Sequence, residues 1–463
     1  MGLRSLRHLF FCALLSSTLF IAACKPGIYL KNQGDILAIA SMQTIVDDDF
    51  IHMAMDPKQI ELGKLLFFDK IMSGNENISC STCHHPMTFS TDNLSLPIGQ
   101  GGAGLGPARR VVLDGETPVR ERMPRNAPDL FNRGMKSFKT LFHDGRLSTD
   151  YSQSNHFRNP AGDALPEGFS HALEAQTIFP LTNPTEMAGH AGQNAIADCA
   201  DAGDFTCLWG EVVDRLRQNS VYVDLFKDAY GLDDGAEISI VHVGKSLAAF
   251  ISASFRADRS PFDQYLRGDE SAMSHKAKKG MELFYGKASC VNCHSGVLQT
   301  DQSFHAIAMP QIGPGPGGDG YQGHDDFGRE RATGDQADRY KFRTPSLRNV
   351  ELTGPYGHDG AYESLEDVVR HHLNPGISLA NYNLDQAFLP DAGPDLNLID
   401  QIVLDDFLSK ASLIVANELQ PVDLSEEEIQ CLLAFLRSLT DSNSMHLGHL
   451  IPGSVPSGLP IAD

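Results

Sequence analysis

Two copies of one five-residue pattern decide how this chain folds: Cys80-Ser-Thr-Cys83-His84 in its first half and Cys290-Val-Asn-Cys293-His294 in its second. The pattern C-x-x-C-H is the attachment sequence of c-type haem. Two thiols are needed because each forms a thioether bond with one vinyl group of the porphyrin, and the histidine that follows becomes the proximal ligand of the iron. A zinc site would need further paired ligands, and a thioredoxin-like site would not need the histidines. The two complete copies therefore predict two covalently bound haem c groups.

Further short runs recur in the same order in both halves, as expected for an internal repeat. A Gly-x-x-Leu-Phe-aromatic run precedes each attachment pattern, while Pro-x-Leu-x-Asn and then His-Asp-Gly follow it. These runs begin at Gly63, Pro128 and His143 in the first half and at Gly280, Pro345 and His358 in the second. The sequence therefore predicts a mainly α protein of two cytochrome c-like helical haem domains with long loops, related by duplication.

Local signals agree with a helical protein. Asp56-Pro57 is typical of a helix start, because proline is tolerated in the first turn, and Ile60, Leu65 and Leu66 would then face inward. Segments rich in glycine, proline and aspartate predict loops at residues 94–108 and 310–334.

The last helix has the clearest pattern. Ser425 and Glu428 form a capping box, and the apolar residues that follow fall on one face: Ile429, Leu432, Leu433, Leu436 and Leu439. Cys431 lies on the same helix and is expected to be an inert core thiol. Cys199 and Cys207 lie in a polar segment, where they would either form a disulfide in an oxidising compartment or remain thiols.

Residues 1–23 have the plan of a secretory signal peptide. Arg4, Arg7 and His8 form a basic start, and an apolar stretch follows. The run Ile21-Ala-Ala-Cys24 resembles a bacterial lipoprotein cleavage box, in which the cysteine becomes the lipidated first residue; the alternative is a plain signal peptide that contains a cysteine. We therefore expect a periplasmic protein that is anchored to a membrane through Cys24.

These signals divide the chain into five segments: a lipoprotein-type signal peptide (1–23), a tether (24–45), an N-terminal haem domain (46–240), a C-terminal haem domain (241–440) and a tail (441–463). Hydrophobic residues make up 41% of the chain and charged residues 21%, as in soluble globular proteins. The formal net charge of −22 argues against a nucleic-acid partner, because proteins that bind nucleic acids carry basic faces.

Residues 45–440 resemble the bacterial dihaem cytochrome c peroxidases and the related MauG-type enzymes. The resemblance rests on runs at residues 62–69, 78–80, 183–187, 343–350 and 352–360, among them Asn183-Pro-Thr-Glu-Met187. Residues 147–175 and 188–215 are longer than the core of that family requires and are interpreted as surface insertions.

This resemblance implies an enzyme that reduces hydrogen peroxide with electrons from a small periplasmic donor, a cytochrome c or a cupredoxin. The haem of His84 would be the peroxidatic one, and the haem of His294 would pass electrons to it. Glu186 matches the acid–base glutamate of the family, and Gln176 matches its partner glutamine. A homodimer is possible, since dimers are common in the family. The alternatives are a MauG-like enzyme that oxidises a protein or organic substrate, and a dihaem electron carrier without catalysis.

The resemblance also implies a calcium ion between the domains. Its protein ligands match Asn126, Thr353 and Pro355, which would supply an amide oxygen and two backbone carbonyls, the hard oxygen donors that calcium prefers. The alternative is that Asn126 and Thr353 only close local turns.

Three positions depart from the family pattern. Gln100 replaces a histidine that caps the peroxidatic haem in members that need reductive activation, so we expect that haem to be permanently open. His372 stands where methionine or tyrosine usually binds the second haem, which predicts bis-histidine ligation by His294 and His372, with His371 as the alternative; otherwise Met309 or another residue would ligate. His143 replaces a tryptophan between the haems, where it would either bridge them by hydrogen bonds or simply pack.

Overall fold

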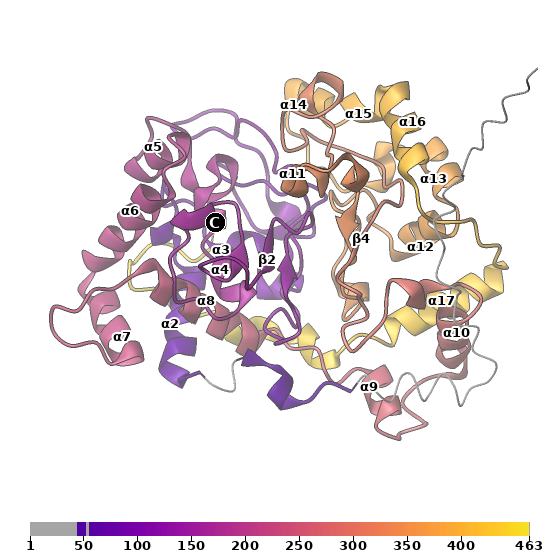
Figure 1. Cartoon of the computed structure of the whole chain (residues 1–463), viewed down its shortest axis with the longest axis horizontal. Coiled ribbons are helices and arrows are strands. Elements are labelled where there is room, and N and C mark those ends of the chain that lie inside the picture. The colour runs from indigo at the N-terminus through magenta and orange to yellow at the C-terminus, as the bar shows by residue number, and fades with distance from the viewer. Residues whose placement is uncertain (1–43, 52–54, 463) are drawn as a thin grey trace, which may run out of the picture.

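The computed structural model describes residues 44–51 and 55–462, and its helices gather in two lobes that lie side by side (Figure 1). The first lobe holds the indigo to pink segments together with the yellow C-terminal tail, and the second holds the salmon, orange and remaining yellow segments; each lobe has its own hydrophobic core. The expected signal peptide 1–23, Cys24 and the tether up to residue 43 lie outside the described residues. Within the described ranges, no helix has both the length and the apolar character needed to cross a membrane.

The fold is mainly helical, as predicted. The helices of the first lobe are α2 (Pro57–Phe68), α3 (Cys80–Cys83), α4 (Ala172–Gln176), α5 (Ala195–Asp201), α6 (Phe205–Arg217), α7 (Ser220–Tyr230) and α8 (Ile240–Ser254). Those of the second lobe are α9 (Pro261–Leu266), α10 (His275–Tyr285), α11 (Glu330–Thr333), α12 (Leu365–Leu373), α13 (Pro375–Asn381), α14 (Pro394–Ile399), α15 (Ile402–Asp405), α16 (Phe407–Ala416) and α17 (Glu426–Arg437).

Matching pairs of helices build the two cores. In the first lobe α2 packs along α8, and in the second α10 packs along α17. A glycine of the repeated run makes the closest approach in each pair. A Cβ atom at Gly63 would lie 1.8 Å from the carbonyl oxygen of Ser246, and one at Gly280 would lie 1.8 Å from that of Cys431. Only glycine therefore allows these helices to approach so closely.

A repeated asparagine holds the segment that follows each pair. Asn132 and Asn349 both have a φ of 59°, a left-handed conformation that asparagine tolerates. The side-chain amide of Asn132 exchanges two hydrogen bonds of 2.9 Å with the backbone of Ala257, which follows α8. The amide oxygen of Asn349 accepts a hydrogen bond of 2.8 Å from the backbone of Asp441, which follows α17. The two asparagines thus have equivalent roles in the two lobes.

Two small antiparallel sheets supply the strands found among the described residues. The first has the order β1 (Thr140–Leu141), β2 (Leu147–Thr149) and β3 (Phe157–Arg158), with Leu141 opposite Leu147 and Thr149 opposite Phe157. The second pairs β4 (Phe304–His305) with β5 (Phe342–Arg343), with Phe304 opposite Arg343. The connection between β1 and β2 contains the His143-Asp-Gly run.

The sequence correctly predicted where α2 and α17 begin. The side chain of Asp56 accepts a hydrogen bond from the backbone of Lys58 at the start of α2, and Ser425 and Glu428 form the expected capping box of α17. Cys431 is buried in the second lobe. The inward face of α2 agrees with the prediction in part. Leu66 is buried and Leu65 packs, partly buried, against the first core, whereas Ile60 is not part of that core. Leu62, Phe67 and Phe68 are buried as well, because contact at Gly63 brings their face towards α8.

The boundary between the two cores lies later in the chain than the sequence suggested. Helix α8, placed by sequence in the second domain (241–440), packs in the first core together with Ala257, because its apolar face covers α2. Segment 188–215, interpreted as a surface insertion, also buries Ile196, Trp209 and Val212 in that core.

The tail after α17 returns to the first lobe, where Figure 1 marks the C-terminus. Leu447 and Val455 belong to the first hydrophobic core. The hydroxyl of Ser457 donates a 2.6 Å hydrogen bond to the buried carboxylate of Asp69, which also accepts one of 2.7 Å from the hydroxyl of Tyr222. The tail therefore connects the two lobes a second time.

Candidate active site

The first attachment pattern forms a single helical turn, α3, which begins after Ser79 and ends at His84. Cys80 and Cys83 are three residues apart, so their sulfurs share one face of this turn. The Nδ1 atom of His84 lies 3.0 Å from the carbonyl oxygen of Ser90, which fixes the ring and leaves Nε2 for a metal. Burial lowers the pKa of His84, so the imidazole is neutral, the form that binds iron.

The second attachment pattern begins with a 3-10 turn, Cys290–Asn292, and continues through Cys293 to His294. The Nδ1 atom of His294 lies 3.1 Å from the carbonyl oxygen of Gln299, so its Nε2 is again left for a metal. Burial and the nearby His372 lower the pKa of His294 to about 4. Both attachment histidines are therefore oriented by a backbone carbonyl.

His372 on α12 faces the second attachment histidine. The ring centres of His294 and His372 are 6.4 Å apart, and the Nδ1 atom of His372 lies 2.8 Å from the carbonyl oxygen of Val368. Two metal–imidazole bonds of about 2 Å each, together with the radii of the two rings, span roughly this distance. The pair therefore leaves room for one iron between two imidazoles.

The alternative ligands are placed differently. Both ring nitrogens of His371 have partners within the protein: Nδ1 lies 3.0 Å from the hydroxyl of Tyr362, and Nε2 lies 2.8 Å from the carbonyl oxygen of Ile307. Met309 is buried, and its sulfur lies against Gly357. Among the described residues, Nε2 of His372 has no hydrogen-bond partner, so the geometry favours His372 over His371 as the ligand.

Glu186 lies on a five-residue π-helical turn, Pro184–Ala188, that starts at Asn183. The side chain of Asn183 accepts hydrogen bonds from the backbone of Thr185 (2.9 Å) and of Glu186 (3.0 Å). Burial raises the pKa of Glu186 to about 7, against the opposing charge of Arg146. Burial and the charge of Glu186 raise the pKa of Cys80. The backbone of Gly74, six residues before Cys80, donates a 2.8 Å hydrogen bond to the carbonyl oxygen of Met187, so the turn of Glu186 lies beside the segment that leads to the first attachment turn.

Two glutamines lie in the same lobe. Gln176 is the last residue of α4 and is partly buried, and no hydrogen bond joins its side chain to Glu186 among the described residues. Gln100 is buried, and its side-chain amide is fully engaged. Its nitrogen donates to the carbonyl oxygen of Met187 (2.7 Å), while its oxygen accepts from the amide of Asn75 (3.2 Å). Gln100 is therefore held against the turn of Glu186.

The two His-Asp-Gly runs meet where the lobes join. The backbone of Asn126 donates to the carbonyl oxygen of His358 (2.8 Å), and its own carbonyl oxygen lies 3.0 Å from Nε2 of His143. The backbone of Arg343 donates to the carbonyl oxygen of His143 (2.7 Å). Burial, together with the charge of Arg125, lowers the pKa of His143 to about 3, so this histidine is neutral and hydrogen-bonded at the boundary.

A buried ion-pair group lies beside these runs. Arg125 contacts Asp144 at 2.6 Å and Asp326 at 2.7 Å, and all three side chains are less than a tenth exposed. Asp144 belongs to the first lobe and Asp326 to the second. The two carboxylates raise the pKa of Arg125 despite its burial. Removing Arg125 would leave two buried carboxylates in the interface without the cation that they share.

The residues expected to bind calcium lie near this boundary. The amide nitrogen of Asn126 donates to the carbonyl oxygens of Leu94 (2.8 Å) and Ser95 (3.2 Å), which directs its amide oxygen elsewhere. Thr353 and Pro355 lie in the loop that reaches His358, whose carbonyl accepts the hydrogen bond from Asn126. The Gly354–Pro355 peptide bond is cis.

Comparisons with known proteins show the family to which this chain belongs. A family profile described as di-haem cytochrome c peroxidase matches residues 57–271. The methylamine utilization protein MauG of Methylorubrum extorquens is 30% identical over 388 residues, which are 83% of this chain and 79% of that protein. The chain belongs to the di-haem cytochrome c peroxidase and MauG family.

Two further members illustrate the breadth of the family. The cytochrome c551 peroxidase of Nitrosomonas europaea is 30% identical over 311 residues, which are 67% of this chain and 71% of that enzyme. A solved structure of a MauG-like protein associated with microbial copper homeostasis superposes with a TM-score of 0.56 at 25% identity, covering 89% of this chain and 95% of that one. Membership makes this chain an oxidoreductase and implies two haem c groups.

The residues around the attachment patterns suit such a group. Besides the two cysteine–histidine sets, Arg348 has a buried guanidinium whose Nε donates to the carbonyl oxygen of Val297, three residues beyond His294. Its Nη1 pairs with Asp263, whereas Nη2 has no hydrogen-bond partner among the described residues. A buried cationic donor beside an attachment site matches a cofactor that carries carboxylates.

Sequence reasoning missed the polar residues that surround the Glu186 turn. Asn75, Gln193 and Asn194 join Gln100 there through side-chain amides. Asn75 lies five residues before Cys80 and belongs to no recognisable motif, and the other two fall in the segment interpreted as a surface insertion. A signal for Asn194 was available, because asparagine is a favoured helix N-cap.

Proposed function

We propose that this protein reduces hydrogen peroxide to water with electrons from a small periplasmic redox protein, a cytochrome c or a cupredoxin. One observation carries the proposal, namely the asymmetry of the two attachment histidines. His294 has a second imidazole, His372, at 6.4 Å between ring centres. The described residues give His84 no such ring partner. A partly buried carboxyl of raised pKa, Glu186, instead lies on a turn that is hydrogen-bonded through Met187 to Gly74, in the segment that leads to Cys80.

When bound, the haems supply iron centres that exchange electrons and, where a coordination position is open, accept a small oxidant. Cys80, Cys83 and His84 would hold the first haem, and Cys290, Cys293, His294 and His372 the second. Electrons from the donor enter on the side of His294 and reach the first lobe across the boundary that His143 and Asn126 form.

The chain's own contribution to the reaction is proton transfer. Reduction of one peroxide to two waters consumes two electrons and two protons. A Glu186 carboxylate oxygen takes the proton from the oxygen that approaches the metal and delivers it to the other oxygen, which leaves as water. A pKa of about 7 suits this role, because both protonation states are populated near neutral pH. The amide of Gln176 would orient the peroxide.

Gln100 bears on whether the first haem is open from the start. A primary amide is a poor iron ligand, and both polar atoms of this one are already hydrogen-bonded, to Met187 and to Asn75. We therefore expect that the fully oxidised protein reacts with peroxide without prior reduction.

Electron paramagnetic resonance of the oxidised protein, before and after addition of peroxide, tests the proposal. We expect one high-spin and one low-spin haem at the start, and loss of the high-spin signal with peroxide. Turnover of peroxide with a reduced small cytochrome should accompany it. Two low-spin haems in every redox state would refute the proposal, because peroxide could then reach neither iron.

A second candidate is a MauG-like enzyme that oxidises a protein or an organic substrate. The similarity to the Methylorubrum extorquens protein, over 83% of this chain, favours it. His143 in place of the tryptophan expected between the haems argues against it. Peroxide-dependent modification of a partner without consumption of a donor would support this function. A carrier without catalysis would bind neither cyanide nor carbon monoxide at either haem.

For the location and assembly of the protein we propose what the sequence predicts. We propose export to the periplasm with a lipid on Cys24, and one calcium ion held by Asn126, Thr353 and Pro355; a homodimer is compatible with the family. We also propose that the two lobes arose by duplication. The equivalent contacts of Gly63 and Gly280, and the equivalent conformations of Asn132 and Asn349, support that origin.

A further inference from the structure

Neutral amide groups hold the carbonyl oxygens of the turn that carries Glu186. The carbonyl oxygen of Thr185 accepts a hydrogen bond from the backbone of Gln100 (2.8 Å). That of Met187 accepts from the side chain of Gln100 (2.7 Å) and from the backbone of Gly74 (2.8 Å). The carbonyl oxygen of Ala188 accepts from the side chain of Asn194 (3.1 Å). The carbonyls on both sides of Glu186 are thus held by donors from three separate segments.

Asn75 joins these donors to one another. Its amide oxygen accepts from Asn194 (2.8 Å), and its amide nitrogen donates to Gln100 (3.2 Å) and to Gln193 (2.9 Å). None of the four side chains is ionisable, so the network holds the turn without adding a charge that would shift the pKa of Glu186.

The backbone also presses closely against this turn. A Cβ atom at Gly74 would lie 1.7 Å from the carbonyl oxygen of Ala188, and one at Gly99 would lie 2.0 Å from that of Thr185. A π-helical turn holds one residue more than an α-helical turn and is uncommon without support. The close contacts and the amide network supply that support from both sides.

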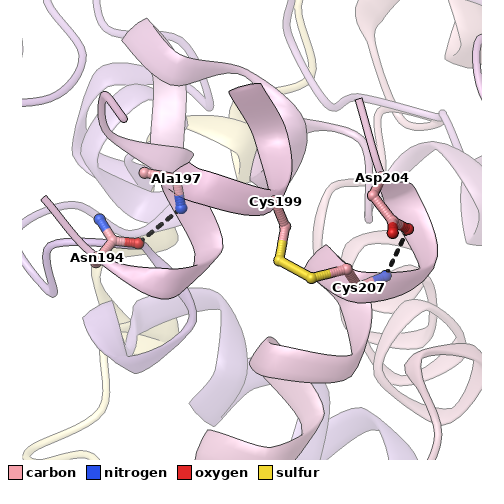
Figure 2. Close-up of a disulfide and its surroundings, with 5 residues drawn as sticks. All are labelled: Asn194, Ala197, Cys199, Asp204 and Cys207. Carbon is pink, nitrogen blue, oxygen red and sulfur yellow. Dashed lines mark hydrogen bonds between the residues drawn. A yellow bond between two sulfur atoms is a disulfide. The ribbon is translucent and has the colours of Figure 1, made fainter. Parts of the chain in front are cut away.

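Asn194 connects the network to the α5–α6 segment. Its amide oxygen accepts a hydrogen bond of 2.8 Å from the backbone of Ala197 and so caps α5. Figure 2 shows this cap and the disulfide between Cys199 on α5 and Cys207 on α6. Because α6 buries Trp209 in the first core, the segment that presents Asn194 is fixed at its far end.

We propose that Asn75, Gln100 and Asn194 are positioning residues that hold the Glu186 carboxyl at the peroxide site by fixing the carbonyls of its turn. This inference rests on the proposed function, in which Glu186 transfers the proton. A carboxyl that transfers a proton must stay within hydrogen-bonding distance of its target. Misplacement by about 1 Å costs about 10²-fold in rate.

We call Asn75, Gln100 and Asn194, which hold the Glu186 turn, the clamp. Asn194→Ser tests the clamp with a matched control. Serine preserves the helix cap but is too short to reach Ala188 and Asn75. Asp204→Ser makes the corresponding cap exchange at α6, where Asp204 accepts a 2.9 Å hydrogen bond from the backbone of Cys207 and does not touch the Glu186 turn. Asn75→Ser serves as a second variant should Asn194→Ser fold poorly.

The first measurement is hydrogen exchange of residues 184–189 in the oxidised holoprotein. We expect exchange to be at least about tenfold faster in Asn194→Ser and unchanged in Asp204→Ser, with unaltered haem spectra. The second is kcat/KM for peroxide, which should fall by about tenfold to 10²-fold in Asn194→Ser. In a Glu186→Gln background the same change should cause no further loss, because the clamp acts through Glu186.

The outcomes separate this inference from the proposed function. Faster exchange with unchanged kcat/KM, or an equal loss in the Glu186→Gln background, would overturn the positioning role. Unchanged exchange would overturn it as well. A protein that does not turn over peroxide would refute the proposed function instead. In that case the clamp is tested by infrared titration of the Glu186 carboxyl, whose band is identified by its loss in Glu186→Gln. The titration midpoint should move in Asn194→Ser and stay in place in Asp204→Ser.

Discussion

The pH dependence of the peroxide reaction is the sharpest test of Glu186. Burial raises the pKa of its carboxyl from 4.5 to about 7. The proposed mechanism needs the carboxylate, because the first event is removal of a proton from peroxide. With a pKa of about 7, roughly a tenth of the protein carries the carboxylate at pH 6 and roughly nine tenths at pH 8. The rate of the peroxide step should therefore rise about tenfold between these pH values.

A single-turnover assay isolates this step from delivery of electrons by the donor. Protein is mixed rapidly with peroxide at pH values from 5 to 9, and the haem absorbance is followed. Glu186→Gln should lower the rate by about 10² to 10⁴-fold and remove the inflection near pH 7. Glu121→Gln is the matched control. Glu121 is an exposed carboxylate that accepts a 2.6 Å hydrogen bond from the hydroxyl of Thr185 on the same turn, so its loss should leave the inflection in place.

Two results would refute this reasoning. A rate that falls as the pH rises through 7 would mean that the protonated carboxyl is the active form in the limiting step. An inflection that persists in Glu186→Gln would mean that another group titrates.

Three further changes have defined outcomes. His372→Ala removes the second imidazole that would hold the haem of His294, so the low-spin resonance signal of that haem should become high-spin, and an unchanged signal would count against the ligand pair. Replacing both Cys199 and Cys207 with alanine removes the cross-link of a short loop. The entropy that the unfolded chain regains should lower the free energy of unfolding by about 2.5 kcal/mol. The urea concentration at the midpoint of unfolding of the oxidised holoprotein should fall, and an equal midpoint would contradict this reasoning. Treatment with EGTA should lower Tm, and calcium but not magnesium should restore it; a Tm indifferent to both would argue against a calcium ion at Asn126.

Features that depend on residues close together in the sequence could be predicted, and features that depend on distant residues could not. The caps of α2 and α17 depend on residues three or fewer positions apart, and both were located correctly. The attachment patterns are equally local. The pairing of Cys199 with Cys207 was left open, because sequence gives the spacing of two thiols but not the angle between the helices that carry them.

Contacts between distant segments were not predictable in the same way. The surroundings of Glu186 combine residues near positions 75, 100 and 194, and no periodicity in the sequence joins them. The inward face of α2 was predicted only in part for a related reason. Leu65 and Leu66 pack on the first core as expected, but the close contact at Gly63 depends on a missing side chain, which a search for apolar residues does not detect.

The return of the tail to the first lobe matters for biosynthesis. Ser457 binds Asp69 across 388 residues of sequence, and Leu447 and Val455 complete a core whose first helix is made long before them. In a chain that emerges from its amino end, the earlier lobe therefore cannot complete its interior until residues 447–457 have been made. A stop codon that removes these residues should consequently damage the half of the molecule that is synthesised first.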